Sequence, residues 1–206
     1  MARVKIGNVF PSDEYLLSRC APAGYGLGTV NGHDCIDCNT AVLNGVYYVF
    51  GESATNHPGN NMQYGCMVVY RRGVDITQII HYDYYEAKRF SKNGGSSWGK
   101  WEWVNPPMNI GTEYRTTERY MGKPVYASLV NVGEYPESGL RDVDTGIVAT
   151  GIVRFNAVSG YYALPLADNM DISVRHNGET FVVRLNTKGE RIIENDVYVT
   201  LYYIKD

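Results

Sequence analysis

The chain has 206 residues, of which 44% are hydrophobic, and its formal net charge is −3. This length suits one large β-domain or two small ones, and the hydrophobic content argues against a disordered chain. Lys and Arg are scattered without a basic run, which argues against nucleic acid as a partner. No apolar run approaches the ~20 residues that span a bilayer, so we expect no membrane insertion.

Tyrosine and glycine are the most distinctive parts of the composition, with 18 and 22 copies. Tyr, Val, Ile and Thr favour strands, and glycine supplies the positive φ angles of tight turns. The composition therefore predicts an all-β protein. The N-terminal stretch lacks the apolar core of a secretory signal, so we expect a soluble protein made without Sec-type export.

Residues 1–28 form the first predicted region, a connecting segment. Residues 13–19 allow a short helical turn, and the Gly/Pro string at 21–28 breaks any regular structure.

The four cysteines all lie in the first third of the chain, at Cys20, Cys35, Cys38 and Cys66. A zinc site needs a second Cys-x-x-Cys knuckle, and a thioredoxin-like site needs a βαβ setting. We therefore expect buried free thiols, with no metal and no cofactor; zinc is the alternative.

Residues 29–107 hold the second predicted region, a small antiparallel domain. A turn at Asn93–Gly95 is predicted to join strands at Lys88–Phe90 and Trp101–Trp103. Prolines 106 and 107 cannot continue a strand ladder, so the domain ends at 107. The other predicted strands are Val46–Phe50, Met67–Tyr70 and Thr77–Tyr82.

Residues 108–206 form the third region, in which seven or eight antiparallel strands predict a β-sandwich or jelly roll. Gly146–Asn156 is an apolar, β-rich run. Asn177 and Gly178 are typical of a type I′ turn and predict a hairpin over Ile172–Leu185. Val197–Ile204 is apolar on both alternating faces, which predicts a central strand covered on both sides.

Five pieces of the first half resemble the pyocin-knob module of phage tail fibres and phage-tail-like bacteriocins. Members of that family carry an Asp-x-Asn-Thr opening, a Gly-x-Tyr strand, a Thr-Gln-Ile strand and a closing Gly-x-Trp-x-x-Trp. Their order and spacing agree with this chain. The matching pieces are Asp37–Thr40, Gly45–Val49, Gly65–Tyr70, Ile76–Ile80 and Gly94–Trp101.

The end of the chain is similar to a C-terminal domain of phage tail and receptor-binding proteins. Its opening Gly-Lys-Pro-(Val/Ile)-Tyr motif is Gly122–Tyr126 here, and its closing Tyr-x-Lys strand is Leu201–Lys205. The chain departs from the family at Thr145–Ile147, where members often carry His-Gly-Ile. A role for that histidine therefore has no counterpart here.

The two resemblances together imply the distal part of a tail fibre, a receptor-binding protein of the virion made in the bacterial cytoplasm without a signal peptide. The implied fold is a knob followed by a jelly-roll-like β-sandwich tip. The implied partners are a bacterial cell-surface polysaccharide, two further copies in a homotrimer, and other tail or baseplate proteins on the N-terminal side. A non-enzymatic role is expected, because no catalytic arrangement of side chains stands out.

Aromatic residues supply the candidate ligand contacts. The family pattern includes Trp98 and Trp101, which favours internal anchors, so Trp103 is the tryptophan expected to be exposed. Tyr161 and Tyr162 are the main candidates of the C-terminal domain, because tyrosine rings stack on sugars. The remaining candidates are Tyr82, Tyr84, Tyr85, Arg154 and His176. Ordinary half-buried sheet tyrosines and solvated strand charges are the alternative reading.

Two other functions compete with receptor binding. A glycan depolymerase needs two carboxyls across a cleft and usually a long repeating β-helix, and no such repeat is visible in the sequence. A structural connector of the fibre would place receptor binding elsewhere.

Overall fold

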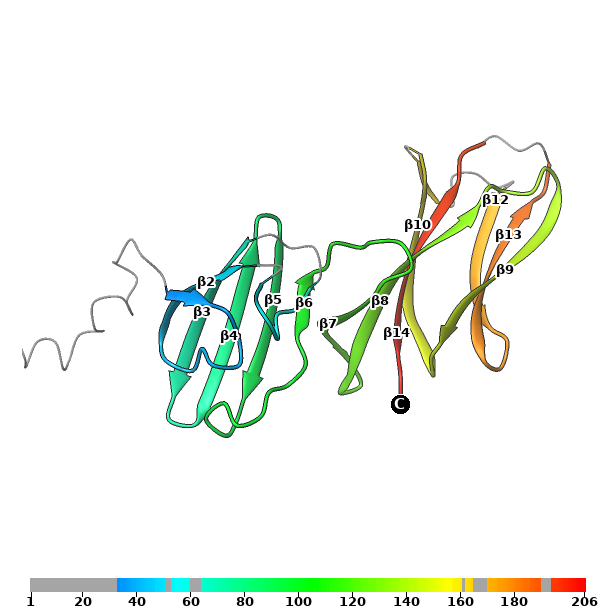
Figure 1. Cartoon of the computed structure of the whole chain (residues 1–206). Coiled ribbons are helices and arrows are strands. Elements are labelled where there is room, and N and C mark those ends of the chain that lie inside the picture. The colour runs from blue at the N-terminus through cyan, green and yellow to red at the C-terminus, as the bar shows by residue number, and fades with distance from the viewer. Residues whose placement is uncertain (1–32, 51–52, 60–63, 161, 165–169, 190–193) are drawn as a thin grey trace, which may run out of the picture. The chain divides into compact units, whose positions relative to one another are not determined.

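The computed structural model describes residues 33–50, 53–59, 64–160, 162–164, 170–189 and 194–206 (Figure 1). These residues form fourteen strands and no helix, which confirms the all-β prediction. None of them lies in a helix with the length and apolar character that a membrane crossing requires. The predicted connecting segment, residues 1–28, lies outside the described residues. The chain divides into two compact units between Trp101 and Glu102, a few residues before the predicted boundary at 107.

The first unit is one sheet whose strands follow the chain order. Its first two strands are parallel, and every later neighbouring pair is antiparallel. The strands are β1 (His33–Cys35), β2 (Gly45–Phe50), β3 (Tyr64–Arg72), β4 (Asp75–Tyr82) and β5 (Tyr85–Ser91).

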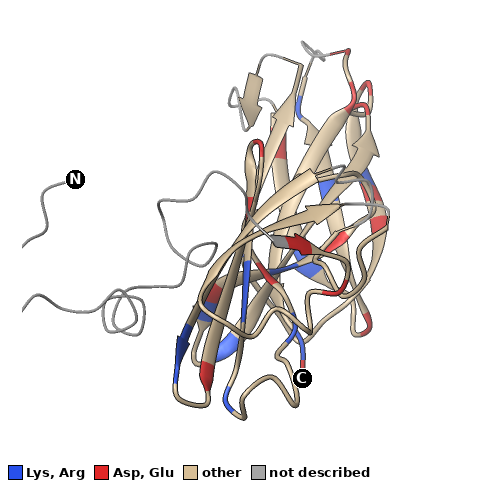
Figure 2. Cartoon of the chain, turned by 60° about the vertical axis from the view of Figure 1, so that its left-hand side comes forward, with Lys and Arg blue, Asp and Glu red and all other residues tan. Residues whose placement is uncertain are grey.

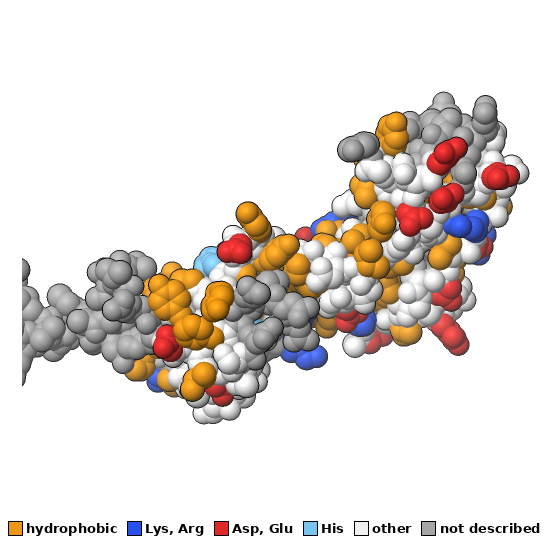
Figure 3. All heavy atoms as spheres, turned by 45° about the horizontal axis from the view of Figure 1, so that its top comes forward, with side chains coloured by type: hydrophobic (Ala, Val, Ile, Leu, Met, Phe, Trp, Pro, Cys, Tyr) orange, Lys and Arg blue, Asp and Glu red, His pale blue; other side chains and the backbone are white. Residues whose placement is uncertain are grey.

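The two faces of this sheet differ because side chains alternate along each strand. One face is buried beneath the loops at 36–44 and 53–59 and contributes Val49, Met67, Ile76 and Ile80 to the core. The opposite face keeps large aromatic side chains in solvent, and Figure 3 shows exposed hydrophobic side chains gathered in patches. The most exposed of these aromatics are Tyr48, Tyr64, Tyr70 and Phe90.

The described cysteines are free thiols, as expected. Cys35 and Cys38 are buried, and Cys66 is half-buried. Cys20 lies outside the described residues.

The second unit contains nine strands in two sheets. One sheet has the order β6-β7-β8-β14-β10-β11, and the other has the order β12-β13-β9. The strands are β6 (Glu102–Asn105), β7 (Glu113–Tyr120), β8 (Lys123–Gly133), β9 (Gly139–Val148), β10 (Gly151–Ser159), β11 (Tyr162–Leu164), β12 (Met170–His176), β13 (Thr180–Thr187) and β14 (Val197–Ile204).

A single apolar core joins these two sheets, which is the arrangement of a β-sandwich. The largest buried side chains of this core include Tyr203 and Leu201 of β14, Phe181 and Leu185 of β13, and Met170 of β12. Strand β14 lies between β8 and β10, so its predicted central place is confirmed. Its second face is only half-buried, so the expected cover on both sides is incomplete.

The apolar, β-rich run Gly146–Asn156 belongs to two strands, because the chain leaves β9 at Val148 and enters β10 of the other sheet at Gly151. One local expectation in this unit is wrong in detail. The predicted hairpin exists, but its turn lies one residue later than expected. Asn177 pairs with Thr180 through an N–H···O bond of 3.0 Å, and of the two predicted turn residues only Gly178 has a positive φ, +109°.

Charged residues of both signs are spread over the strands in Figure 2. On the β12-β13-β9 sheet, Asp142 accepts hydrogen bonds from Arg184 at 2.8 and 3.0 Å and from Arg175 at 2.5 Å. The carboxylate is therefore held between two guanidinium groups on a solvated face.

Candidate functional site

A buried polar pair lies at the centre of the first unit. Gln78 of β4 and Arg89 of β5 are direct cross-strand partners whose side chains point to the covered face. They are 0% and 5% exposed. The Arg89 Nε donates to Gln78 Oε1 at 2.8 Å, and the Gln78 amide donates to the carbonyls of Cys38 and Ala41 at 2.6 and 2.8 Å. This pair therefore fastens the loop at 38–41 to the sheet.

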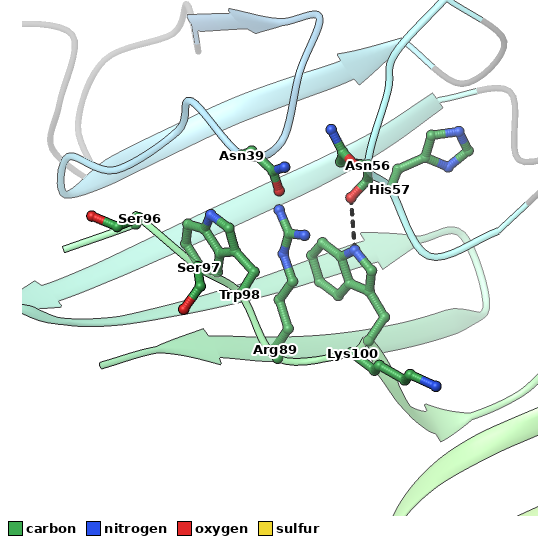
Figure 4. Close-up of a pocket in the computed structure, with 11 residues that line it drawn as sticks. Asn39, Asn56, His57, Arg89, Ser96, Ser97, Trp98 and Lys100 are labelled. Atoms are coloured by element: carbon green, nitrogen blue, oxygen red, sulfur yellow. Dashed lines mark hydrogen bonds between the residues drawn. The ribbon is translucent and has the colours of Figure 1, made fainter. Parts of the chain in front are cut away.

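Two tryptophans enclose the guanidinium of Arg89 (Figure 4). Its Cζ lies 4.4 Å from the ring centroid of Trp98 and 4.5 Å from that of Trp101. At these distances a cation is attracted by the negative face of each ring. Trp101 also donates from Nε1 to the carbonyl of Asn56 at 2.8 Å, so its ring orientation is fixed.

The turn after β5 brings these tryptophans back over the sheet. Ser91 Oγ accepts the N–H of Gly95 at 3.0 Å, and Asn93 Oδ1 accepts the N–H of Ser97 at 2.9 Å. Gly95 has φ +94°, and a Cβ there would lie 2.6 Å from Cγ1 of Val42. A glycine is required at this position both by the backbone conformation and by the close approach of the loop.

Asp37 holds the opposite wall of the site. Its Oδ1 accepts the N–H of Asn39 and the side-chain amide of Asn56, both at 2.8 Å. Burial raises the pKa of this carboxyl, but the hydrogen bonds from Asn56, Asn39 and Thr55 outweigh it, so the pKa is lowered overall.

These elements enclose a pocket of about 490 Å³. Its lining combines flat indole faces with amides, hydroxyls and cations, the mixture expected of a site for a polar ring-shaped ligand. The lining residues are Asn39, Asn56, His57, Arg89, Gly95, Ser96, Ser97, Trp98, Gly99, Lys100 and Trp101.

Four buried polar atoms of this lining have no hydrogen-bond partner among the residues that the structure describes. They are Arg89 Nη2, Trp98 Nε1, Asn39 Oδ1 and His57 Nδ1. Buried polar groups are nearly always paired, so a concentration of unpaired ones in a single pocket requires an explanation. Burial lowers the pKa of Arg89 to about 10, which leaves it a cation at neutral pH, and burial also lowers the pKa of His57.

Two of the predicted ligand contacts have buried side chains, so the expectation that Trp103 is exposed is wrong. Trp103 is 5% exposed and packs edge-on against Tyr114, with ring centroids 5.8 Å apart. Tyr82 is 3% exposed beneath the loops of the first unit. Of their neighbours, Tyr84 is 82% exposed, and Tyr85 is half-buried.

The predicted contacts of the second unit lie on three separate strands, and none of them lines the pocket. Tyr162 is 45% exposed on β11. Arg154 of β10 forms two hydrogen bonds to Glu118, at 2.6 and 2.7 Å, and its Cζ lies 3.8 Å from the ring centroid of Tyr202. The His176 ring lies within hydrogen-bonding distance of the Ala149 carbonyl, at 3.1 Å. Tyr161 lies outside the described residues.

The pocket itself was not predicted from the sequence. One available signal was that Gln78 and Arg89 occupy inward positions of adjacent predicted strands, where apolar residues are expected. Asn39, Asn56 and Lys100 carry no such signal, because they lie in loops.

Among the described residues, no group of three or more His, Cys, Asp or Glu side chains is placed to hold a metal ion. No family model matches the chain, and no curated protein matches it.

Three solved structures match most of the chain, and all are pyocin tail fibres. An N-truncated R2-type pyocin tail fibre is 12% identical, with 86% of this chain and 99% of that chain covered and a TM-score of 0.32. The C-terminal part of the P. aeruginosa R1 pyocin fibre is also 12% identical, with 82% and 66% covered and a TM-score of 0.29. At TM-scores this low, the likeness carries no argument about this chain.

Proposed function

We propose that the chain is a host-attachment part of a phage tail fibre or a related tail-like particle, and that the pocket of its first unit binds a bacterial cell-surface glycan without catalysis. The observation that carries this proposal is the pocket of about 490 Å³ with two indole walls and unpaired polar atoms. Sugar sites combine aromatic stacking with a few fixed polar groups, and this volume suits one or two sugar rings.

The knob resemblance supports the attachment role, because the matching pieces meet at this site. Asp37 belongs to the opening motif, Gln78 to the Thr-Gln-Ile strand, and Trp98 and Trp101 to the closing motif. Hydrogen bonds through Asn56 and the guanidinium of Arg89 connect all of them. Residues far apart in the sequence thus form the walls and the floor of one pocket.

A homotrimer is part of the proposal. The aromatic residues Tyr48, Tyr64, Tyr70 and Phe90 are exposed on the outer face of the first sheet, and contiguous exposed apolar surface marks sites of association. Single sugar sites bind weakly, and three linked sites would raise the avidity by orders of magnitude. Attachment to other tail proteins would use the N-terminal side.

An array of bacterial surface polysaccharides, probed with the purified chain and with Trp101→Ala, tests the binding role. We expect the chain to bind at least one polysaccharide and the variant to lose that signal. A matched variant, Tyr120→Ala, changes an exposed aromatic residue outside the pocket and should bind as the unchanged chain does. Failure of the chain to bind any bacterial polysaccharide, together with a monomeric state in sedimentation, would contradict the proposal.

A structural connector is the second candidate function. It is favoured by the burial of Arg89 and Gln78, which brace the loops whatever the pocket holds. Unchanged adsorption of a particle whose fibre lacks the pocket residues would support the connector. Release of reducing ends from a bound polysaccharide would instead indicate a depolymerase.

A further inference from the structure

The ionisable side chains that line the pocket are Arg89, Lys100 and His57, so its charge is positive at neutral pH. Arg89 is 5% exposed, and no carboxylate forms an ion pair with it among the described residues. A buried cation without a counter-charge is costly, because the lost hydration is not replaced. Two indole faces and Gln78 Oε1 offset part of this cost, yet Nη2 remains unpaired.

We propose that the pocket selects an acidic sugar, a pyranose ring that carries a carboxylate or a phosphate. This inference rests on the proposed glycan-binding function and names the ligand class of the same site. Arg89 lies at the floor of the pocket, and the exposed Lys100 lies at its rim with its side chain directed away from Arg89 (Figure 4). An anionic substituent is therefore attracted by Arg89 at contact distance and by Lys100 over a longer distance. Charge-assisted hydrogen bonds are about twice as strong as neutral ones, and a desolvated guanidinium is weakly screened by salt.

The rest of the lining fits the neutral part of such a ligand. Trp98 and Trp101 each have one ring face against Arg89, and both are half-buried, so the rest of each ring is available to the apolar side of a pyranose. Asn39 Oδ1 is an unpaired acceptor for a sugar hydroxyl, and Trp98 Nε1 is an unpaired donor. Ser96 and Ser97 add hydroxyls at the rim.

Asp37 is the acidic group to consider against this proposal, because it acts electrostatically on Arg89. It does not line the pocket, and its Oδ1 already accepts two hydrogen bonds, from the Asn39 N–H and the Asn56 amide. Its charge therefore weakens the positive potential at the pocket without occupying the place of a ligand.

The test is a titration of the purified chain with methyl glucuronoside, glucose 6-phosphate, methyl glucoside and inorganic phosphate. Ligand-induced chemical shifts of the Trp98 and Trp101 indole signals report binding at the pocket. We expect an acidic sugar to bind about tenfold more tightly than methyl glucoside, which is the ratio that one good charge-assisted contact provides. Only the part of this advantage that comes from the exposed Lys100 should shrink at high salt, because the buried Arg89 is weakly screened.

Two lysine variants assign the effect to the pocket and avoid the risk that an Arg89 variant fails to fold. Lys100→Gln should lower the advantage of the acidic sugar several-fold while methyl glucoside binding is unchanged. Lys88→Gln removes an equal charge from the opposite face of the sheet and should have no effect.

Equal binding of acidic and neutral sugars would overturn the inference and leave glycan binding intact. So would inorganic phosphate that binds as tightly as glucose 6-phosphate, because the sugar ring would then not be recognised. If carboxylate and phosphate sugars differ, the tighter one identifies the source of the charge. A chain that binds no polysaccharide on the array refutes the proposed function itself.

Discussion

The interiors of the two units differ in what they bury. The first unit encloses a guanidinium, an amide and several unpaired polar atoms beneath its loops. The core of the second unit is almost entirely apolar, and its buried Tyr203 donates its hydroxyl to Glu113 at 2.6 Å. Arg141 Nε is a buried polar atom of this unit without a partner among the described residues. Unpaired buried polar groups lower stability, so a fold retains them where they serve another purpose. The contrast supports the proposal that the first unit binds the ligand, while the second unit is the more stable of the two.

The largest expected effect is a loss of stability in the second unit. Phe181 is 1% exposed and packs against Tyr203, with ring centroids 6.1 Å apart. Phe181→Ala should lower the free energy of unfolding of this unit by about 3–5 kcal/mol, through lost burial and a residual cavity. Hydrogen exchange followed by mass spectrometry resolves the two units. Phe90→Ala, at a 49% exposed site, is the control and should change little.

A second substitution removes one member of the buried polar pair of the first unit. Gln78→Leu removes the donor to two carbonyls and the acceptor of Arg89. We expect a loss of roughly 3 kcal/mol from the first unit alone, because several buried groups lose their partners together. Thr77→Val, one residue earlier on the opposite sheet face, is the matched control. A loss equal to that of the control would mean that the pair is not required for packing.

A third prediction concerns the turn after β5, which brings Trp98 and Trp101 over the sheet. Gly95→Ala is strained by φ +94° and by the 2.6 Å approach to Val42. It should destabilise the first unit by roughly 1–3 kcal/mol and shift the tryptophan fluorescence, as Trp98 and Trp101 move away from Arg89. Gly73→Ala has φ +63° without a neighbour within 4 Å, so it isolates the backbone strain alone. Equal losses for both variants would exclude a contribution from the close contact.

The smallest effect concerns the solvated ion pairs of the second unit. Hydrogen bonds from Arg184 and the nearby charge of Arg175 lower the pKa of Asp142 to about 2. A lowered pKa adds stability above the unfolded value of about 4, and this contribution disappears as the pH falls from there towards 2. As the pH falls over that range, the melting temperature of the Asp142→Asn variant should therefore fall less than that of the unchanged chain. Parallel curves for the two proteins, or no influence of salt, would contradict this account.

The architecture was largely predictable, because it depends on local alternation. The pattern of β14 and the turn residues at 177–178 predicted a central strand and a hairpin, and both exist. The turn type was wrong because Asn177 Oδ1 accepts the N–H of Thr180 at 2.9 Å, which places Gly178 first in the turn. Side-chain hydrogen bonds of this kind are not visible in a strand pattern.

The site was less predictable, because it depends on contacts between distant residues. Trp101 and Trp103 share a face only if one strand contains both, and β6 begins at Glu102. Trp103 is buried by Tyr114, a contact that spacing does not predict. The pocket needs loops at 39 and 56 to meet the turn at 95, and loop positions follow from tertiary packing rather than from periodicity.

The central place of β14 has a consequence for how the second unit is made. Its neighbours β8 and β10 are synthesised earlier, and β14 pairs with β8 across a sequence separation of about seventy residues, a range at which strand pairing is slow. Until β14 leaves the ribosome, both neighbours expose unpaired edges and the sandwich has no closed core. A translation product that stops just before Val197 would therefore lose the whole second unit and tend to aggregate, while the first unit folds unaffected.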